Sequence, residues 1–217
     1  MISPERLDAM QLGWVRLVGG YGVGPAAAYP VFDKLVEAYA EPHRHYHTLE
    51  HLGEMFRVAG RLRASDPGAV MLAVWFHDVV YDTRAKDSEA RSAEIAAEWL
   101  APLGVPEATL TKVKELIRAT AHFSGEPPAD PDARHLLDAD LAILGAGESR
   151  YARYAADIRK EYAWVPDADY RAGRAKVLEA FLARPRIYFA DVLHAEGDAA
   201  ARRNLRAELA RWEAGAA

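Results

Sequence analysis

The chain of 217 residues contains no cysteine. Disulfide bonds and thiolate-bound metals are therefore excluded, and any metal must be held by imidazole and carboxylate groups. No stretch approaches about 18 uncharged apolar residues, the length that a membrane-spanning helix needs. The N-terminal segment carries an early acid and lacks the apolar run of a signal peptide, so we expect a cytoplasmic protein.

An excess of positive charge is also missing. The net charge is −5, which argues against a nucleic-acid partner because nucleic-acid binders usually present a basic face. The chain has no glycine-rich phosphate loop followed by Lys-Ser or Lys-Thr, and no GxSxG nucleophile motif. A small phosphorylated substrate is still compatible with these absences, since a bound metal ion can supply local positive charge inside an acidic protein.

Helical periodicity fills most of the chain. Apolar residues recur every three or four positions, and no alternating β-branched run interrupts them. The sequence therefore predicts an all-α fold, with residues 1–217 in one domain and the terminal helices packed on a core at about 29–190. A homodimer through these amphipathic terminal helices is left open. The expected helices are 5–18, 25–40, 48–64, 71–82, 88–101, 106–122, 133–144, 148–162, 168–183 and 197–213.

Four of the eight histidines lie within the stretch EPHRHYHTLEHL, residues 41–52. On a helix, His47 and His51 would lie one turn apart on the same face. A lone histidine on an apolar face is more often a core residue than a metal ligand. The histidines alone therefore do not decide between a metal site and a structural role.

Acidic residues interrupt two apolar segments. His77 and Asp78 lie inside the run AVWFHDVV, where a carboxylate needs a cation, a metal or several hydrogen-bond donors to stay charged. Asp138 and Asp140 stand at the mouth of the apolar segment DADLAIL. Each residue singly has a structural explanation such as a helix cap, but the set as a whole favours a metal site.

The ordered elements His51, His77-Asp78 and Asp140 resemble the H…HD…D signature of the HD superfamily of metal-dependent phosphohydrolases. The segments RHYHTLEHL, WFHDVVYD, DSEARSAEIA and DADLAILG together resemble a largely uncharacterised branch of predicted phosphohydrolases within it. The resemblance covers about residues 29–190. It implies an HD-like helical bundle whose metal ligands come from separate helices.

The resemblance implies a metal site made by His51, His77, Asp78 and Asp140. One or two divalent cations are expected there, with Mn, Fe, Co, Ni, Zn and Mg as candidates. Two imidazoles and two carboxylates leave coordination positions open for water and a phosphate oxygen. Asp138 would then cap its helix or contact a metal-bound water.

Further residues are candidates for catalysis. His47 would contact the substrate, orient a ligand or bind a second metal, and His122 would contact the substrate or supply a ligand to a second metal. Asp82, one helical turn after Asp78, is predicted as the general base or as the residue that positions water. A metal-bound Asp78 is the alternative acceptor for the proton of the attacking water. Some family members carry a Glu where this chain has Tyr81.

Arg44 is the first candidate for a phosphate contact, because its planar guanidinium matches phosphate oxygens, although a plain surface arginine fits equally well. Arg84 and Lys86 are second candidates. The leading hypothesis is a metal-dependent phosphohydrolase that acts on a small phosphorylated metabolite, nucleotides included, by attack of metal-bound water. The alternatives are a di-iron oxygenase of the same fold and a non-catalytic, regulatory nucleotide-binding module.

Overall fold

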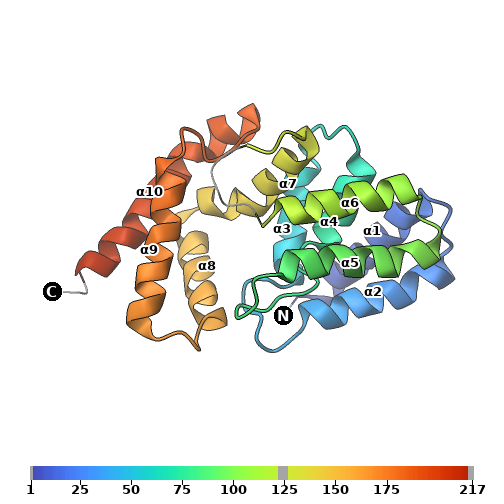
Figure 1. Cartoon of the computed structure of the whole chain (residues 1–217), viewed down its shortest axis with the longest axis horizontal. Coiled ribbons are helices and arrows are strands. Elements are labelled where there is room, and N and C mark those ends of the chain that lie inside the picture. Colours follow the sequence, from blue (N-terminus) through green and yellow to red (C-terminus); the bar gives the residue numbers. More distant parts are fainter. Residues whose placement is uncertain (1, 122–126, 215–217) are drawn as a thin grey trace.

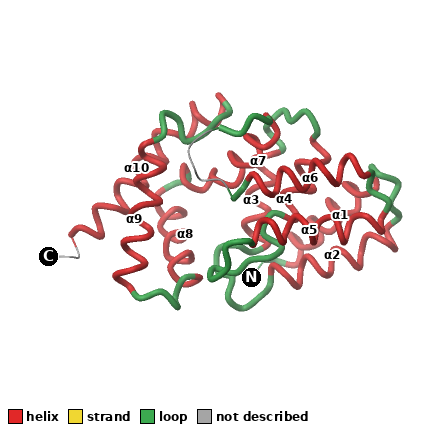
Figure 2. Tube along the Cα trace, viewed as in Figure 1, coloured by secondary structure: helices red, strands yellow, loops and turns green. Residues whose placement is uncertain are grey.

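A computed structural model describes residues 2–121 and 127–214 of the chain. Within these ranges all regular structure is helical and no strand is present, which confirms the predicted all-α fold (Figure 2). The elements are α1 (Pro4–Gly19), α2 (Pro25–Tyr39), α3 (Leu49–Ala59), α4 (Pro67–Phe76), α5 (Ser88–Leu100), η1 (Ala101–Leu103), α6 (Glu107–Ala119), α7 (Pro131–Leu141), η2 (Ala142–Gly145), α8 (Glu148–Glu161), α9 (Asp167–Ala183) and α10 (Asp191–Ala214).

The helices form two groups that share one buried core. Helices α1, α2, α4, α5 and α6 lie at one end of the molecule and α8, α9 and α10 at the other, with α3 and α7 between them (Figure 1). A single cluster of buried apolar side chains runs from Trp14 in α1 to Leu205 in α10. No helix in the described ranges combines the length and apolarity that crossing a membrane requires.

Helix α4 is the buried centre of the first group. It begins after Asp66, whose side chain accepts a hydrogen bond from the Ala69 N–H at 2.9 Å, and Pro67 occupies the first turn. The helix is apolar on all sides, as the sequence predicts. It ends at Phe76, however, and not at residue 82 as expected from the sequence.

The early end of α4 has a cause elsewhere in the chain. Arg44 donates one hydrogen bond to the Asp78 carbonyl at 2.7 Å and another to the Val79 carbonyl at 3.1 Å. The Tyr39 hydroxyl donates to the Trp75 carbonyl at 3.0 Å. Carbonyl groups at the end of a helix need donors from outside the helix, and here they are side chains that precede α3.

Two other boundaries differ from the prediction. Helix α3 begins at Leu49 after its N-cap Thr48, close to the expected start, so His47 precedes the helix, but it ends at Ala59 and not near residue 64. Helix α10 begins at Asp191 and passes through Gly197, which was expected to lie at a boundary. A Cβ at Gly197 would stand 3.0 Å from the Tyr188 ring, so the glycine gives that buried ring its space.

Candidate metal centre

The four predicted metal ligands come together where the two groups of helices meet. His51 lies in α3, His77 and Asp78 follow α4, and Asp140 lies in α7. His51 Nε2 is 3.1 Å from Asp140 Oδ1, and His77 Nε2 is 3.1 Å from Asp78 Oδ2 and 3.9 Å from Asp140 Oδ1. Donor atoms bound to one cation at about 2.0–2.2 Å lie about 3–4 Å apart. The ligand atoms of His51, His77 and Asp78 all lie within 4.8 Å of one another, which suits a single divalent cation, and Asp140 lies beside the two histidines.

The imidazoles of this cluster have nitrogen atoms without well-aligned hydrogen bonds. The Nε2 atoms of His51 and His77 are buried and make no well-aligned hydrogen bond, although a carboxylate oxygen lies 3.1 Å from each of them. The Nδ1 of His77 donates to the Val74 carbonyl at 3.0 Å, which fixes the ring with its Nε2 directed at the cluster, where a cation would take the place of the proton on this nitrogen. Buried polar atoms without a partner are rare, and these two fit the donor set of a bound metal.

The charges of the centre also suit a cation. Burial alone would raise the pKa of Asp78, but the neighbouring His77 lowers it below its usual range. The pKa of Asp140 is likewise lowered by His51 and His77 against the effect of burial. Burial would lower the pKa of His77, yet Asp78 raises it to about 9, whereas burial keeps the pKa of His51 low. Both carboxylates are therefore ionised at neutral pH.

His47 also faces the cluster, although it is not on α3. Its Nδ1 donates to Glu161 Oε2 at 2.7 Å, and its Nε2 lies 3.8 Å from Asp78 Oδ2. Its ring stacks on Tyr81 at 4.2 Å and lies 5.6 Å from the His51 ring. Burial would lower the pKa of His47, but Glu161 and Asp78 raise it. His47 thus has one nitrogen fixed and the other directed at the centre.

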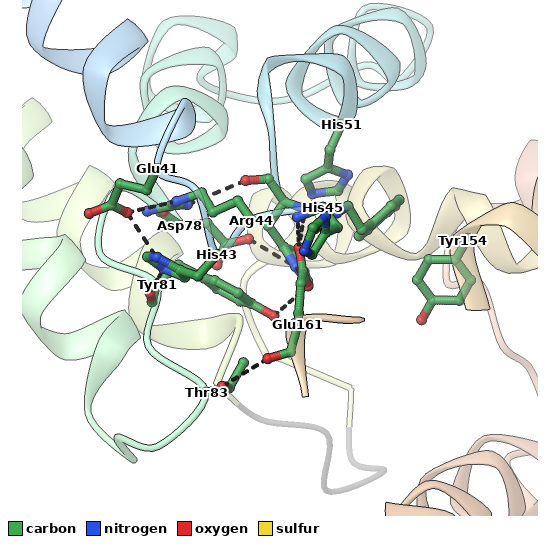
Figure 3. Close-up of polar contacts among 12 residues, drawn as sticks. Glu41, His43, Arg44, His45, His51, Asp78, Tyr81, Thr83, Tyr154 and Glu161 are labelled. Atoms are coloured by element: carbon green, nitrogen blue, oxygen red, sulfur yellow. Dashed lines mark hydrogen bonds and ion pairs between the residues drawn. The ribbon is translucent and has the colours of Figure 1, made fainter. Parts of the chain in front are cut away.

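Glu161, at the end of α8, orients this region and was missed in the sequence. Its Oε1 accepts the backbone N–H groups of His45, Tyr46 and His47 at 2.7, 2.7 and 3.0 Å (Figure 3). Its Oε2 accepts the Tyr81 hydroxyl at 2.8 Å in addition to His47. Burial would raise the pKa of Glu161, but these hydrogen bonds, those of His47 above all, lower it to about 2.

A sequence signal for Glu161 does exist. The buried residues of α8 are Tyr151, Tyr154, Ile158 and Glu161, which follow one another at helical spacing. Glu161 therefore occupies a position on an apolar helix face where a core side chain is expected. A charged residue at such a position indicates that donors must reach it from other segments.

The predicted phosphate contact of Arg44 is wrong. Its guanidinium is buried, and all three of its nitrogens are already engaged (Figure 3). Nε donates to Glu41 at 2.9 Å, and the two terminal nitrogens donate to the carbonyls of Asp78, Val79 and, at 3.4 Å, His47. Arg44 holds the turn that carries Asp78, because these backbone carbonyls lie within its reach and a phosphate would have to displace them.

Asp82 and Arg84 do not lie in the centre either. Because α4 ends at Phe76, Asp82 is not one helical turn after Asp78, and its predicted position as a general base is wrong. Asp82 is exposed and accepts the Arg84 N–H at 2.9 Å. The exposed Arg84 guanidinium lies 5.3 Å from the centre of the Trp164 ring instead of facing the cluster.

Two further expectations have different outcomes. Asp138 neither caps its helix nor faces the cluster, since its carboxylate accepts the N–H groups of Phe189 and Ala190 at 2.8 and 2.6 Å. Burial raises the pKa of Asp138 to about 6. The predicted substrate contact or metal ligand His122 lies outside the described residues.

A cavity of about 690 Å³ opens over the cluster. His47, His77, Asp78 and Asp140 line one end of it. The rest is lined mainly by side chains of α8, of α9 and of the segment that connects them. The centre is therefore accessible to a small molecule that is much larger than a phosphate ion.

Comparisons with protein-family models, with curated proteins and with solved structures find no match to this chain. The resemblance of its four motifs to the HD superfamily stays a prediction. What the centre can do follows from its own side chains.

Proposed function

We propose that the chain is a metal-dependent phosphohydrolase that acts on a small phosphorylated metabolite. The observation that carries the proposal is the pair of buried Nε2 atoms without well-aligned hydrogen bonds, on His51 and His77, which face ionised carboxylates at one end of a cavity. With Asp78 and Asp140 they would hold a divalent cation through four donors. Such a set leaves coordination positions open, as hydrolysis of a phosphate ester requires.

A divalent cation bound here would lower the pKa of a water molecule and offset the negative charge of a phosphate. In this proposal, His47 handles the proton of the leaving group. Its Nδ1 is fixed by Glu161, so its Nε2 can give a proton to the oxygen that leaves phosphorus. Glu161 would stabilise the charged imidazole and hold its ring in this orientation.

An oxidative reaction is the second candidate, since an extra imidazole beside the cluster is what a second metal would use. His47 provides such a group, because its Nε2 is 3.8 Å from Asp78 Oδ2. Two irons per chain and an oxygen-dependent absorption change would support a di-iron oxygenase. A regulatory module would instead bind a nucleotide in the presence of metal without releasing phosphate.

The proposal is tested by elemental analysis of the purified full chain. Phosphate release from a broad panel of phosphomonoesters is then measured with Mn, Co, Ni, Zn and Mg in turn. We expect Asp78→Asn and Asp140→Asn to weaken metal binding at least about a hundredfold and to abolish phosphate release. The matched control is Asp82→Asn, an exposed carboxylate outside the cavity, which should retain both properties.

His47→Gln separates proton transfer from metal binding. We expect it to retain the metal and to lower kcat by about 10²- to 10⁴-fold, the range of general acid–base catalysis. Unchanged metal content in Asp78→Asn would refute the ligand set. A complete lack of phosphate release with all five metals would refute the hydrolase.

A further inference from the structure

The cavity continues away from the metal centre into a lobe of large apolar side chains. We define the aromatic lobe by Tyr154 of α8, Tyr162 and Trp164 of the α8–α9 connection, and Tyr170, Val177 and Phe181 of α9. Only five large apolar side chains in the described ranges are strongly exposed, and two of them, Trp164 and Val177, line this lobe. Exposed apolar side chains inside a concave site indicate a surface that a ligand covers.

The ring of Trp164 is held in place although it is exposed. Its Nε1 donates to Thr83 Oγ1 at 2.8 Å, and the Arg84 guanidinium lies 5.3 Å from the ring centre. Thr83 in turn donates to the Glu161 carbonyl at 3.3 Å. Trp164 therefore forms a flat wall of the lobe that is linked through Thr83 to Glu161, the residue that orients His47. Because this ring is already held in place, binding of a flat ligand against it would cost little conformational entropy.

One polar atom in the lobe has no partner. The Tyr170 hydroxyl is buried and makes no hydrogen bond, while its ring packs against Tyr162 at 6.0 Å and Trp212 at 5.7 Å. Buried hydroxyl groups are normally hydrogen-bonded. A ligand with a single polar group on an otherwise apolar ring would suit this surface.

The charges that line the cavity do not suit a long phosphate chain. Beyond Asp78 and Asp140, the described residues that line it include two acids, Glu89 and Asp169, and three basic residues, Arg174, Lys176 and Arg184, so the net positive charge is small. Arg174 donates to both oxygens of Glu208, at 2.8 and 3.1 Å. A di- or triphosphate carries several negative charges and would find few groups to offset them beyond the metal centre.

We infer that the aromatic lobe binds a flat apolar ring of the substrate. This inference rests on the proposed function, and it makes the preferred substrate a phosphate monoester of an aromatic alcohol rather than a polyphosphate. The phosphate would lie at the end of the cavity with His47 and Asp78, and the ring between α8 and α9. Hydrolysis breaks the P–O bond to the aromatic alcohol, forms a P–O bond to water, and leaves a proton on the alcohol oxygen.

The kinetic test compares three substrates on the metal-loaded full chain: 1-naphthyl phosphate, glycerol 2-phosphate and ATP. We expect kcat/KM for 1-naphthyl phosphate to exceed that of the other two at least about tenfold, since a buried ring adds apolar contact. Val177→Asp should remove most of this preference. Val192→Asp is its matched control, because Val192 has the same 42% exposure but lies outside the cavity.

A second pair of variants distinguishes loss of the ring site from a folding defect in Val177→Asp. Gly173 lines the cavity within α9, and a Cβ there meets no other atom within 4 Å, so Gly173→Leu should fold while occupying the space of a ligand. Gly13→Leu in α1 is the control, since Gly13 is also helical with open space around it. We expect the preference for 1-naphthyl phosphate to fall only in Gly173→Leu.

Binding of 2-naphthol to the metal-free protein tests the lobe without catalysis. By calorimetry, the wild type, Val192→Asp and Gly13→Leu should bind alike, and Val177→Asp and Gly173→Leu at least about tenfold more weakly. Phosphate release without a preference for the aryl ester, or equal 2-naphthol binding by all variants, would overturn the inference and leave the proposed hydrolase standing. Selective 2-naphthol binding without phosphate release from any ester would support the ring site and refute the hydrolase.

Discussion

Two buried polar clusters border the same cavity, the second of them through Arg174, and they differ in how well their groups are paired. In the cluster that joins α8, α9 and α10, Arg174 donates to both oxygens of Glu208, and the Tyr151 hydroxyl donates to Glu208 at 2.5 Å. In the candidate metal centre, the Nε2 atoms of His51 and His77 have no well-aligned hydrogen bond. Both clusters are charged and buried, so charge and burial alone do not distinguish them.

The two clusters differ in how fully their hydrogen-bond donors and acceptors are paired. A cluster whose donors and acceptors match is complete without a ligand and ties three helices together. A cluster whose acceptor atoms are not matched by aligned donors is open to a further cation. The first should therefore govern the stability of the free protein, and the second should govern its response to metal.

The largest effect is expected from Arg174→Met, which leaves the Glu208 carboxylate buried without its partner. We expect the free energy of unfolding to fall by about 3–5 kcal/mol, measured by urea denaturation of the metal-free protein. The exposed Lys176→Met on the same helix should change it by less than about 0.5 kcal/mol. The double change Arg174→Met with Glu208→Leu should recover most of the loss. A small effect of Arg174→Met would mean that the paired cluster does not stabilise the fold.

Addition of metal should stabilise the protein through the candidate metal centre and not through the cluster of Arg174 and Glu208. A cation at about 100 times its dissociation constant stabilises a single site by about 2.7 kcal/mol. We expect this gain in stability for the wild type. It is measured by thermal unfolding of the protein with the metal that it retains on purification and of the same protein after the metal is removed. Asp78→Asn should lose the gain, whereas Lys176→Met should retain it. An equal gain in Asp78→Asn would place the cation elsewhere.

Glu161 should make a contribution to the free energy of unfolding that is lost at acidic pH. Its pKa is lowered from 4.5 to about 2 in the folded protein, so folding favours the ionised carboxylate. The stabilisation is present above about pH 4.5 and is lost as the pH falls toward 2. We expect Glu161→Gln to cost about 2–3 kcal/mol at pH 7, with the difference from wild type shrinking below pH 4.5.

The control for this pH dependence is Glu196→Gln. Glu196 forms an exposed ion pair with Arg61, so its replacement should change the stability by less than about 1 kcal/mol. A difference between Glu161→Gln and wild type that stays constant from pH 7 to pH 3 would contradict the role of the ionised Glu161.

The smallest effect on stability is expected from Arg44→Lys. Lysine keeps the charge but cannot donate in the planar fork that reaches Glu41 and the carbonyls of Asp78 and Val79. We expect a loss of about 1–2 kcal/mol in the metal-free protein and a tenfold or greater loss of metal affinity, read by competition with a chelating dye. Arg61→Lys, on an exposed ion pair, is the control and should change neither. Unaltered metal affinity in Arg44→Lys would show that the turn keeps Asp78 in place without Arg44.

The sequence predicted the helical fold, and the four residues that it proposed as metal ligands lie close together in that fold. Apolar periodicity marks the helices, and His77-Asp78 stands out in an apolar run. The place of Asp82 could not be predicted in the same way. It depends on where α4 ends, and that end is bound by Arg44, which lies 34 residues before Asp78.

Glu161 was missed for a related reason. Its partners His45, Tyr46 and His47 precede it by more than 110 residues, so no local pattern joins them. The helical spacing on α8 indicates that Glu161 is buried but does not identify what it binds. The expected phosphate contact of Arg44 failed likewise, since a guanidinium near histidines serves backbone carbonyls as readily as a ligand.

The hydrogen bonds between Glu161 and residues 45–47 also have a consequence for biosynthesis. Every side chain proposed to hold the cation belongs to the first 140 residues, whereas Glu161 is translated 21 residues after Asp140. At about 5–20 residues per second, the ribosome adds this carboxylate about one to four seconds later. The nascent chain thus contains the complete ligand set before it contains the group that orients His47.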